Sequence, residues 1–135
     1  MTPAKPRYTL PLAGKTYELE GSFALIEAAE HALNESVISI MLRCAQMPVN
    51  EMSRLIATLV TACGTKLTAA QVGETLWNEV GVSSDEYAMI CLHVHAFLRI
   101  TLVKPSERAE TAKRMGELLG KPEKASRGKN TGGSA

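Results

Sequence analysis

The sequence of 135 residues predicts a mainly α-helical fold: a five-helix, bundle-like domain with a small N-terminal β-hairpin and a disordered basic C-terminal tail. Apolar residues recur at helical spacing, most regularly between Met52 and Cys63. Two capping-box patterns, Thr68-Ala69-Ala70-Gln71 and Ser83-Ser84-Asp85-Glu86, each precede a further apolar stretch. Alternation of period two is confined to residues 8–19. We therefore expect one domain over residues 1–103, and a short helix and tail over 104–135.

The hairpin is predicted from two short alternating runs. Tyr8, Leu10 and Leu12 form one run, and Tyr17 and Leu19 form the other after the Ala13-Gly14 break. A two-stranded ribbon is marginal alone, so its Tyr/Leu face should pack on the helices. Pro11 has no N–H to donate, so its strand should be an edge or Pro11 should point outward.

The first two helices are delimited by capping residues. Ser22 can cap a helix that reaches Leu33, where Asn34 tolerates the left-handed conformation that ends it. Ser36 can then begin a second helix, which Pro48 stops.

The third and fourth helices are predicted from caps and glycines. We expect Asn50 to cap the third, which Gly64 closes. The Thr68 capping box opens the fourth, which ends at Gly81, with Trp77 beside its apolar stripe.

The fifth helix is apolar on two sides. Because successive helical residues lie 100° apart, its large residues divide into opposite faces. One face comprises Tyr87, Ile90, Cys91, Val94 and Leu98, and the other comprises Met89, Leu92, Ala96 and Ile100. The second face is the candidate partner-binding surface, with burial inside the bundle as the equal alternative.

A sixth, short helix over 106–119 should carry Ala112, Met115 and Leu119 on one stripe before the tail from Gly120.

Charge is distributed unevenly. Residues 1–103 carry seven Lys/Arg and ten Asp/Glu, a net of −3, whereas residues 104–135 carry eight and four, a net of +4.

The three cysteines, Cys44, Cys63 and Cys91, lie in apolar segments without C-x-x-C spacing, which favours free thiols in a reducing cytoplasm. The N-terminus has no secretory pattern, and the apolar run over 87–103 is too short and too interrupted to be a membrane helix.

Residue types that support catalysis do not occur in a catalytic pattern. His93 and His95 would point about 200° apart on a helix and cannot share a metal ion, and Cys91 has no base one turn away. Carboxylate pairs such as Glu27 and Glu30 are expected on solvated faces, and no glycine-rich phosphate loop is present. We expect no enzyme activity, no cofactor and no metal.

A helix-turn-helix cadence over residues 67–83 raises the alternative of a small DNA-binding regulator. The helix in the recognition position begins with Asp85 and Glu86, which would face phosphates. Specific nucleic-acid binding is therefore the second hypothesis.

A family resemblance is carried by five short segments and the apolar helix that follows them. The segments are Leu12-Ala13-Gly14-Lys15-Thr16-Tyr17, Phe23-Ala24-Leu25-Ile26-Glu27, Ser36-Val37, Leu67-Thr68 and Gly73-Glu74. The order resembles the small tail proteins of gene transfer agents and long-tailed phages, a family labelled tail tube protein or tail assembly chaperone. The likeness covers about residues 7–102. It departs where that family has a glycine after the Phe/Leu/Glu helix and this chain has Asn34.

The resemblance implies a viral assembly factor that acts in the host cell cytoplasm by protein binding. Its partners would be other tail proteins, above all the tape-measure protein, and it could form a homo-oligomer. No cofactor, membrane or specific nucleic acid is implied. A structural tail-tube subunit is the rival within the family, and such subunits are built on β-sheets.

Overall fold

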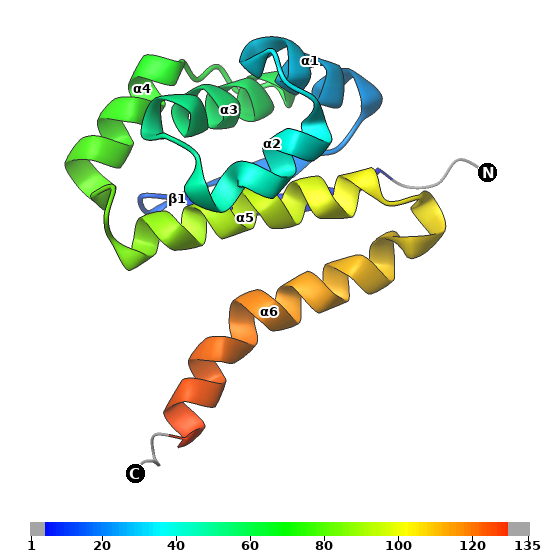
Figure 1. The fold of residues 1–135 in the computed structure, drawn as a ribbon, viewed down its shortest axis with the longest axis vertical. Coiled ribbons are helices and arrows are strands. Elements are labelled where there is room, and N and C mark those ends of the chain that lie inside the picture. The colour runs from blue at the N-terminus through cyan, green and yellow to red at the C-terminus, as the bar shows by residue number, and fades with distance from the viewer. Residues whose placement is uncertain (1–4, 130–135) are drawn as a thin grey trace.

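The computed structural model describes residues 5–129, and the side chains of residues 5–120. This part of the chain forms a two-stranded antiparallel hairpin and six α-helices, which confirms the predicted mainly α fold (Figure 1). The elements are β1 (Arg7–Leu12), β2 (Lys15–Glu20), α1 (Phe23–Leu33), α2 (Val37–Arg43), α3 (Val49–Ala62), α4 (Ala69–Thr75), α5 (Asp85–Leu102) and α6 (Arg108–Lys129). A 3₁₀ turn (Cys44–Gln46) follows α2, a π-helical turn (Leu76–Val80) extends α4, and a 3₁₀ turn (Pro105–Glu107) precedes α6.

The hairpin packs by one face on the helices: β1 contacts α5 and β2 contacts α3. Its other face is exposed at Thr9, Thr16 and Glu18. Ala13 and Gly14 have φ angles of 50° and 83°, the pattern of a tight turn that matches strand twist. Tyr8 pairs with Leu19 across the two strands, and Leu10 pairs with Tyr17. Leu10 and Leu19 are fully buried, so the Tyr/Leu face packs on the helices as predicted.

The predicted caps of the first, second and fourth helices are confirmed. The Ser22 side chain accepts a hydrogen bond from the Leu25 amide at 3.1 Å, and Ser36 accepts from Ser39 at 3.2 Å. Asn34 adopts the left-handed conformation at φ 53°, ψ 49°. Thr68 and Gln71 form both hydrogen bonds of the capping box.

Two predicted helix starts are wrong, the third helix by two residues and the fifth by one. Helix α3 begins at Val49 with Pro48 at the N-cap, not with Asn50, because the fixed φ of proline suits the approach to a helix. Helix α5 is capped by Ser84, whose Oγ accepts from the Tyr87 amide at 3.0 Å. Ser83 lies outside the helix, so the second predicted capping box is not formed.

The C-terminal helix is longer than predicted. Helix α6 continues to Lys129, whereas the sequence predicted its end at Leu119 and a disordered tail from Gly120. Residues 121–129 include Pro122 and Gly128, which disfavour a helix interior, so local propensity did not predict this continuation. The remainder of the predicted tail, residues 130–135, lies outside the described residues.

Gly21 sets how closely the hairpin approaches α5. Its amide donates to the Pro6 carbonyl at 2.8 Å, and a Cβ placed there would lie 2.5 Å from Thr101 Oγ1 and 2.8 Å from Pro6 Cγ. Only glycine fits this contact without movement of β1 or α5.

We predict that Gly21→Ala lowers the free energy of unfolding by about 1–3 kcal/mol, because the methyl group would overpack this junction. Urea denaturation followed by circular dichroism measures the change. Gly116→Ala is the matched control, since no described atom lies within 4 Å of the added Cβ and alanine favours the helix. A Gly21→Ala protein as stable as the wild type would contradict the account.

Candidate protein-binding surface

Helix α5 is packed against several elements at once. It contacts β1, α2, the 3₁₀ turn after α2, and α6. The predicted core face of the helix is confirmed, since Ile90, Cys91, Val94 and Leu98 are buried and Tyr87 is half-buried.

The predicted partner-binding face is divided in two. Met89 and Leu92 are 36% and 42% exposed, whereas Ala96 and Ile100 are 1% and 5% exposed. Neither Ala96 nor Ile100 belongs to the central hydrophobic cluster, because α6 packs on α5 over its C-terminal half (Figure 1). Only Met89 and Leu92 are therefore accessible to a partner while α6 is in place.

The α6 helix lies on α5 through one sparse stripe. Arg108, Thr111, Met115 and Leu119 are half-buried, at spacings of three, four and four residues. Ala112, predicted on this stripe, is exposed, and no side chain over 108–120 is fully buried. Full burial of a Met or Leu side chain stabilises by about 1.5–3 kcal/mol, so half-burial of Met115 and Leu119 together contributes about 1.5–3 kcal/mol.

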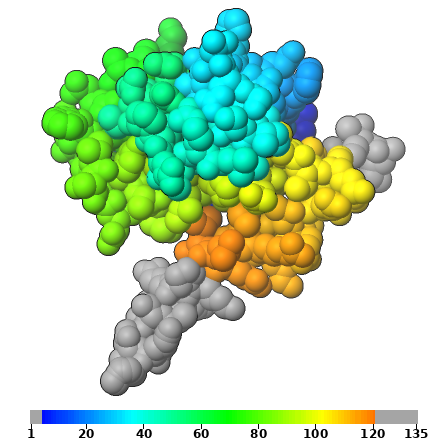
Figure 2. Space-filling view, in the orientation of Figure 1, coloured from blue at the N-terminus to red at the C-terminus, as the bar shows by residue number. Residues whose placement is uncertain are grey.

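Further large apolar side chains are exposed on α2 and α6. Ile38 and Leu42, one turn apart on the outer face of α2, are 52% and 67% exposed, and Leu118 of α6 is 64% exposed. The ring of His95 lies 3.0 Å from the Met41 carbonyl oxygen, and this contact joins α2 to α5. Helices α2, α5 and α6 adjoin on one face of the molecule (Figure 2). These helices carry five of the seven exposed large apolar side chains among the described residues: Ile38, Leu42, Met89, Leu92 and Leu118.

Two exposed aromatic side chains belong to other elements. Phe23 begins α1, and Trp77 lies in the π-helical turn after α4, with exposures of 78% and 69%. Single exposed apolar residues are common on protein surfaces, so neither defines a site alone.

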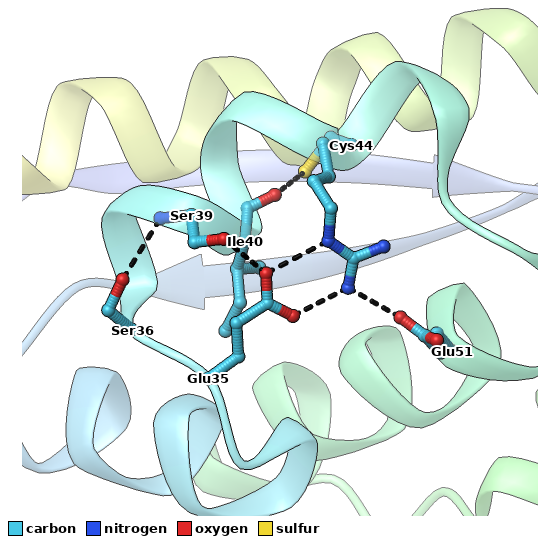
Figure 3. A network of polar contacts seen from close by, with 7 residues as sticks. Glu35, Ser36, Ser39, Ile40, Cys44 and Glu51 are labelled. Atoms are coloured by element: carbon cyan, nitrogen blue, oxygen red, sulfur yellow. Dashed lines mark hydrogen bonds and ion pairs between the residues drawn. The ribbon is translucent and has the colours of Figure 1, made fainter.

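A charged network fixes α2 against α3 (Figure 3). Arg43 donates to both carboxylate oxygens of Glu35, at 2.9 and 2.6 Å, and to Glu51 at 2.5 Å. Ser39 donates to Glu35 as well. The hydrogen bonds from Arg43 hold the pKa of the Glu35 carboxyl at about 2, and the two carboxylates raise the pKa of Arg43. Sequence analysis missed this network, although Glu35, Ser39 and Arg43 recur every four residues.

The histidines form hydrogen bonds on different sides of α5. His93 Nδ1 lies 2.7 Å from the Tyr8 hydroxyl, whereas His95 contacts α2 and accepts from Arg99 Nε at 3.3 Å. Burial raises the pKa of Tyr8 to about 12 and lowers the pKa of His93. Both groups are therefore uncharged near neutral pH, and the pair joins β1 to α5.

The cysteines are free thiols with structural contacts. Burial raises the pKa of Cys44 to about 12 and also raises the pKa of Cys91, which disfavours the reactive thiolate. Cys63 Sγ accepts from the Glu20 amide at 3.2 Å, at the end of β2. Over the described residues, no group of three or more His, Cys, Asp or Glu side chains is arranged to hold a metal ion.

One carboxylate assigned to a solvated face has a structural contact. Glu30 Oε2 accepts from the Val37 amide at 2.9 Å, so α1 helps to cap α2. The hollow between the hairpin turn and α4, about 450 Å³, has Lys15, Glu74 and Glu79 among its lining residues. The Tyr17 and Thr75 side chains line it as well.

The comparisons with known proteins identify no relative: no family model, curated protein or solved structure matches the chain. None of the described helices is both long and apolar enough to span a bilayer.

We predict that the Glu35–Arg43 pair makes stability depend on acid pH. The pKa of Glu35 is lower in the folded chain than its ordinary value of 4.5, so its stabilising effect is complete above about pH 4.5 and disappears toward pH 2. The difference in melting temperature between wild type and Glu35→Gln should therefore be largest near pH 6 and shrink toward pH 2. Glu27→Gln, at an exposed position of α1, is the control. A difference between wild type and Glu35→Gln that is independent of pH would contradict this role.

Proposed function

We propose that this protein is a phage-type tail assembly factor that acts by binding other proteins, with the tape-measure protein as its main partner. The proposal is carried by the exposed apolar side chains on α2, α5 and α6: Ile38, Leu42, Met89, Leu92 and Leu118. These helices are neighbours, since α5 contacts both α2 and α6, and exposed apolar side chains on neighbouring helices favour association with a second protein. The resemblance noted in the sequence supplies the tail partner.

The chemistry of the interior supports a binding role over catalysis. The titratable groups that sequence analysis weighed as catalytic or metal-binding have structural positions: His93 bonds Tyr8, His95 contacts α2, and Cys91 is buried. An enzyme of this size would need such groups to face a substrate cavity. We therefore propose that the protein has no catalytic activity.

The helical fold favours an assembly factor over a tail-tube subunit. Tube subunits of that family are built on β-sheets, whereas the described residues contain one hairpin of two strands. The hairpin is covered by helices on its Tyr/Leu face and does not present a large sheet to neighbouring subunits.

The DNA-binding alternative has less support. Helix α5, which would take the recognition position, has eight buried residues and is covered on several sides. Its exposed first turn carries Asp85 and Glu86, which would repel phosphates.

We predict that the full chain, co-expressed with a tape-measure protein of a long-tailed phage or gene transfer agent, copurifies with that protein. Leu92→Asp should reduce the affinity at least tenfold, because it places a charge in the centre of the exposed apolar face. Phe23→Asp, an equally polar change on α1, is the matched control and should bind as the wild type does. Isothermal titration calorimetry with purified tape-measure fragments measures the affinities.

Absence of any complex, or equal affinity for the Leu92→Asp and wild-type proteins, would contradict the proposal. Gel retardation of duplex DNA at low salt, lost as salt rises, would favour the DNA-binding alternative.

A further inference from the structure

The outer face of α5 is a single apolar stripe with two different environments. Met89, Leu92, Ala96 and Ile100 follow spacings of three, four and four residues, the spacing at which one helix presents anchors to another. The half with Ala96 and Ile100 is covered, and the half with Met89 and Leu92 is exposed. The covering element is α6 of the same chain.

The covering helix carries the same pattern. Its half-buried residues Arg108, Thr111, Met115 and Leu119 follow spacings of three, four and four residues. Helix α6 therefore contacts α5 as an amphipathic helical ligand contacts an apolar groove.

Few polar contacts hold α6 to the rest of the molecule. Arg108 Nη2 donates to the Thr101 carbonyl at 3.3 Å, at the first turn of α6. The ion pairs of this segment, Lys104–Glu107 and Glu110–Arg114, are local. Among residues 5–120, no ion pair joins α6 to the hairpin or to the first five helices.

The two helices diverge along their length. Helix α6 begins beside the C-terminal end of α5 and moves away from it toward the N-terminal end (Figure 1). Met89 and Leu92, two turns and one turn before Ala96, remain uncovered for this reason. An incoming helix can contact these two residues first while α6 is still in place.

The charges beside the exposed half of the α5 stripe indicate which kind of helix can bind there. The first turn of α5, beside the exposed half of the stripe, carries the exposed carboxylates Asp85 and Glu86. The segment that provides the present occupant, residues 104–135, has a net charge of +4. A basic amphipathic helix therefore matches both the apolar stripe and its acidic end.

We propose that the outer face of α5 is a docking groove for a basic amphipathic helix, and that α6 is its resident, displaceable occupant. A helical partner binds first at Met89 and Leu92 and then takes the place of α6 on Ala96 and Ile100. The inference rests on the proposed protein-binding role, but it does not depend on the partner being a tail protein.

The test uses the full chain and a probe taken from the chain itself. Met115→Asp/Leu119→Asp should release α6 and leave the groove free, because both side chains contribute to the half-buried stripe of α6. Ala112→Asp/Leu118→Asp is the matched control, with the same added charge at two exposed positions of the same helix. The probe is a fluorescently labelled synthetic peptide of residues 106–129, and anisotropy measures its binding.

The peptide should bind the Met115→Asp/Leu119→Asp protein at micromolar concentration. It should bind the wild type and the control at least 100-fold more weakly, because a tethered helix competes at an effective concentration in the millimolar range. Adding Leu92→Asp to the released protein should weaken peptide binding about tenfold. Trypsin should cleave after Lys113 and Arg114 faster in the released protein than in the control.

Three results would overturn the proposal. The first is no peptide binding by the Met115→Asp/Leu119→Asp protein, and the second is equal binding by this protein and the wild type. The third is loss of cooperative thermal unfolding in this double variant alone, which would show that α6 belongs to the core. Copurification with tape-measure protein is measured separately, so failure of the docking groove and failure of the proposed function are distinguishable.

Discussion

Helix α5 has more apolar surface than one neighbour can cover, and the arrangement of the other elements follows from this constraint. Its inner face packs against β1, where Phe97 and Tyr8 have ring centroids 6.1 Å apart and His93 bonds the Tyr8 hydroxyl. Its second side receives α2 through His95. The hairpin therefore contacts α5 through β1 and α3 through β2. The third side is left to α6, which covers only part of it.

Polar groups in this molecule act mainly to fix these contacts. The Glu35–Arg43–Glu51 network holds α2 against α3, and Glu30 caps α2 from α1 (Figure 3). Cys63 accepts from β2 at the point where the hairpin ends. With α2 held from two sides, Ile38 and Leu42 remain directed outward. A rigid scaffold that presents apolar residues is the physical requirement for recognition of another helix.

Local signals were sufficient to predict most of the elements. The caps at Ser22, Ser36 and Thr68, and the left-handed Asn34, depend on neighbouring residues alone, and the structure confirms them. The division of α5 into two apolar faces could also be predicted from the sequence, because helical periodicity depends on neighbouring residues alone. Which residues of the second face are buried depends on the position of α6, a contact between helices that periodicity cannot reveal. The length of α6 was underestimated because Pro122 and the surrounding glycines outweighed the helix-forming residues between them.

The central claim is that α6 can leave α5 while the rest of the domain stays folded. Native-state amide hydrogen exchange on the wild-type full chain tests this claim most directly. The amides of residues 90–101 in α5 should exchange among the slowest, together with those of α3, because opening them requires global unfolding. Amides of residues 112–120 in α6 should exchange at least 100-fold faster, through local release that leaves α5 protected on its inner face. Exchange of α5 and α6 at the same slow rate, with the same denaturant dependence, would contradict the account.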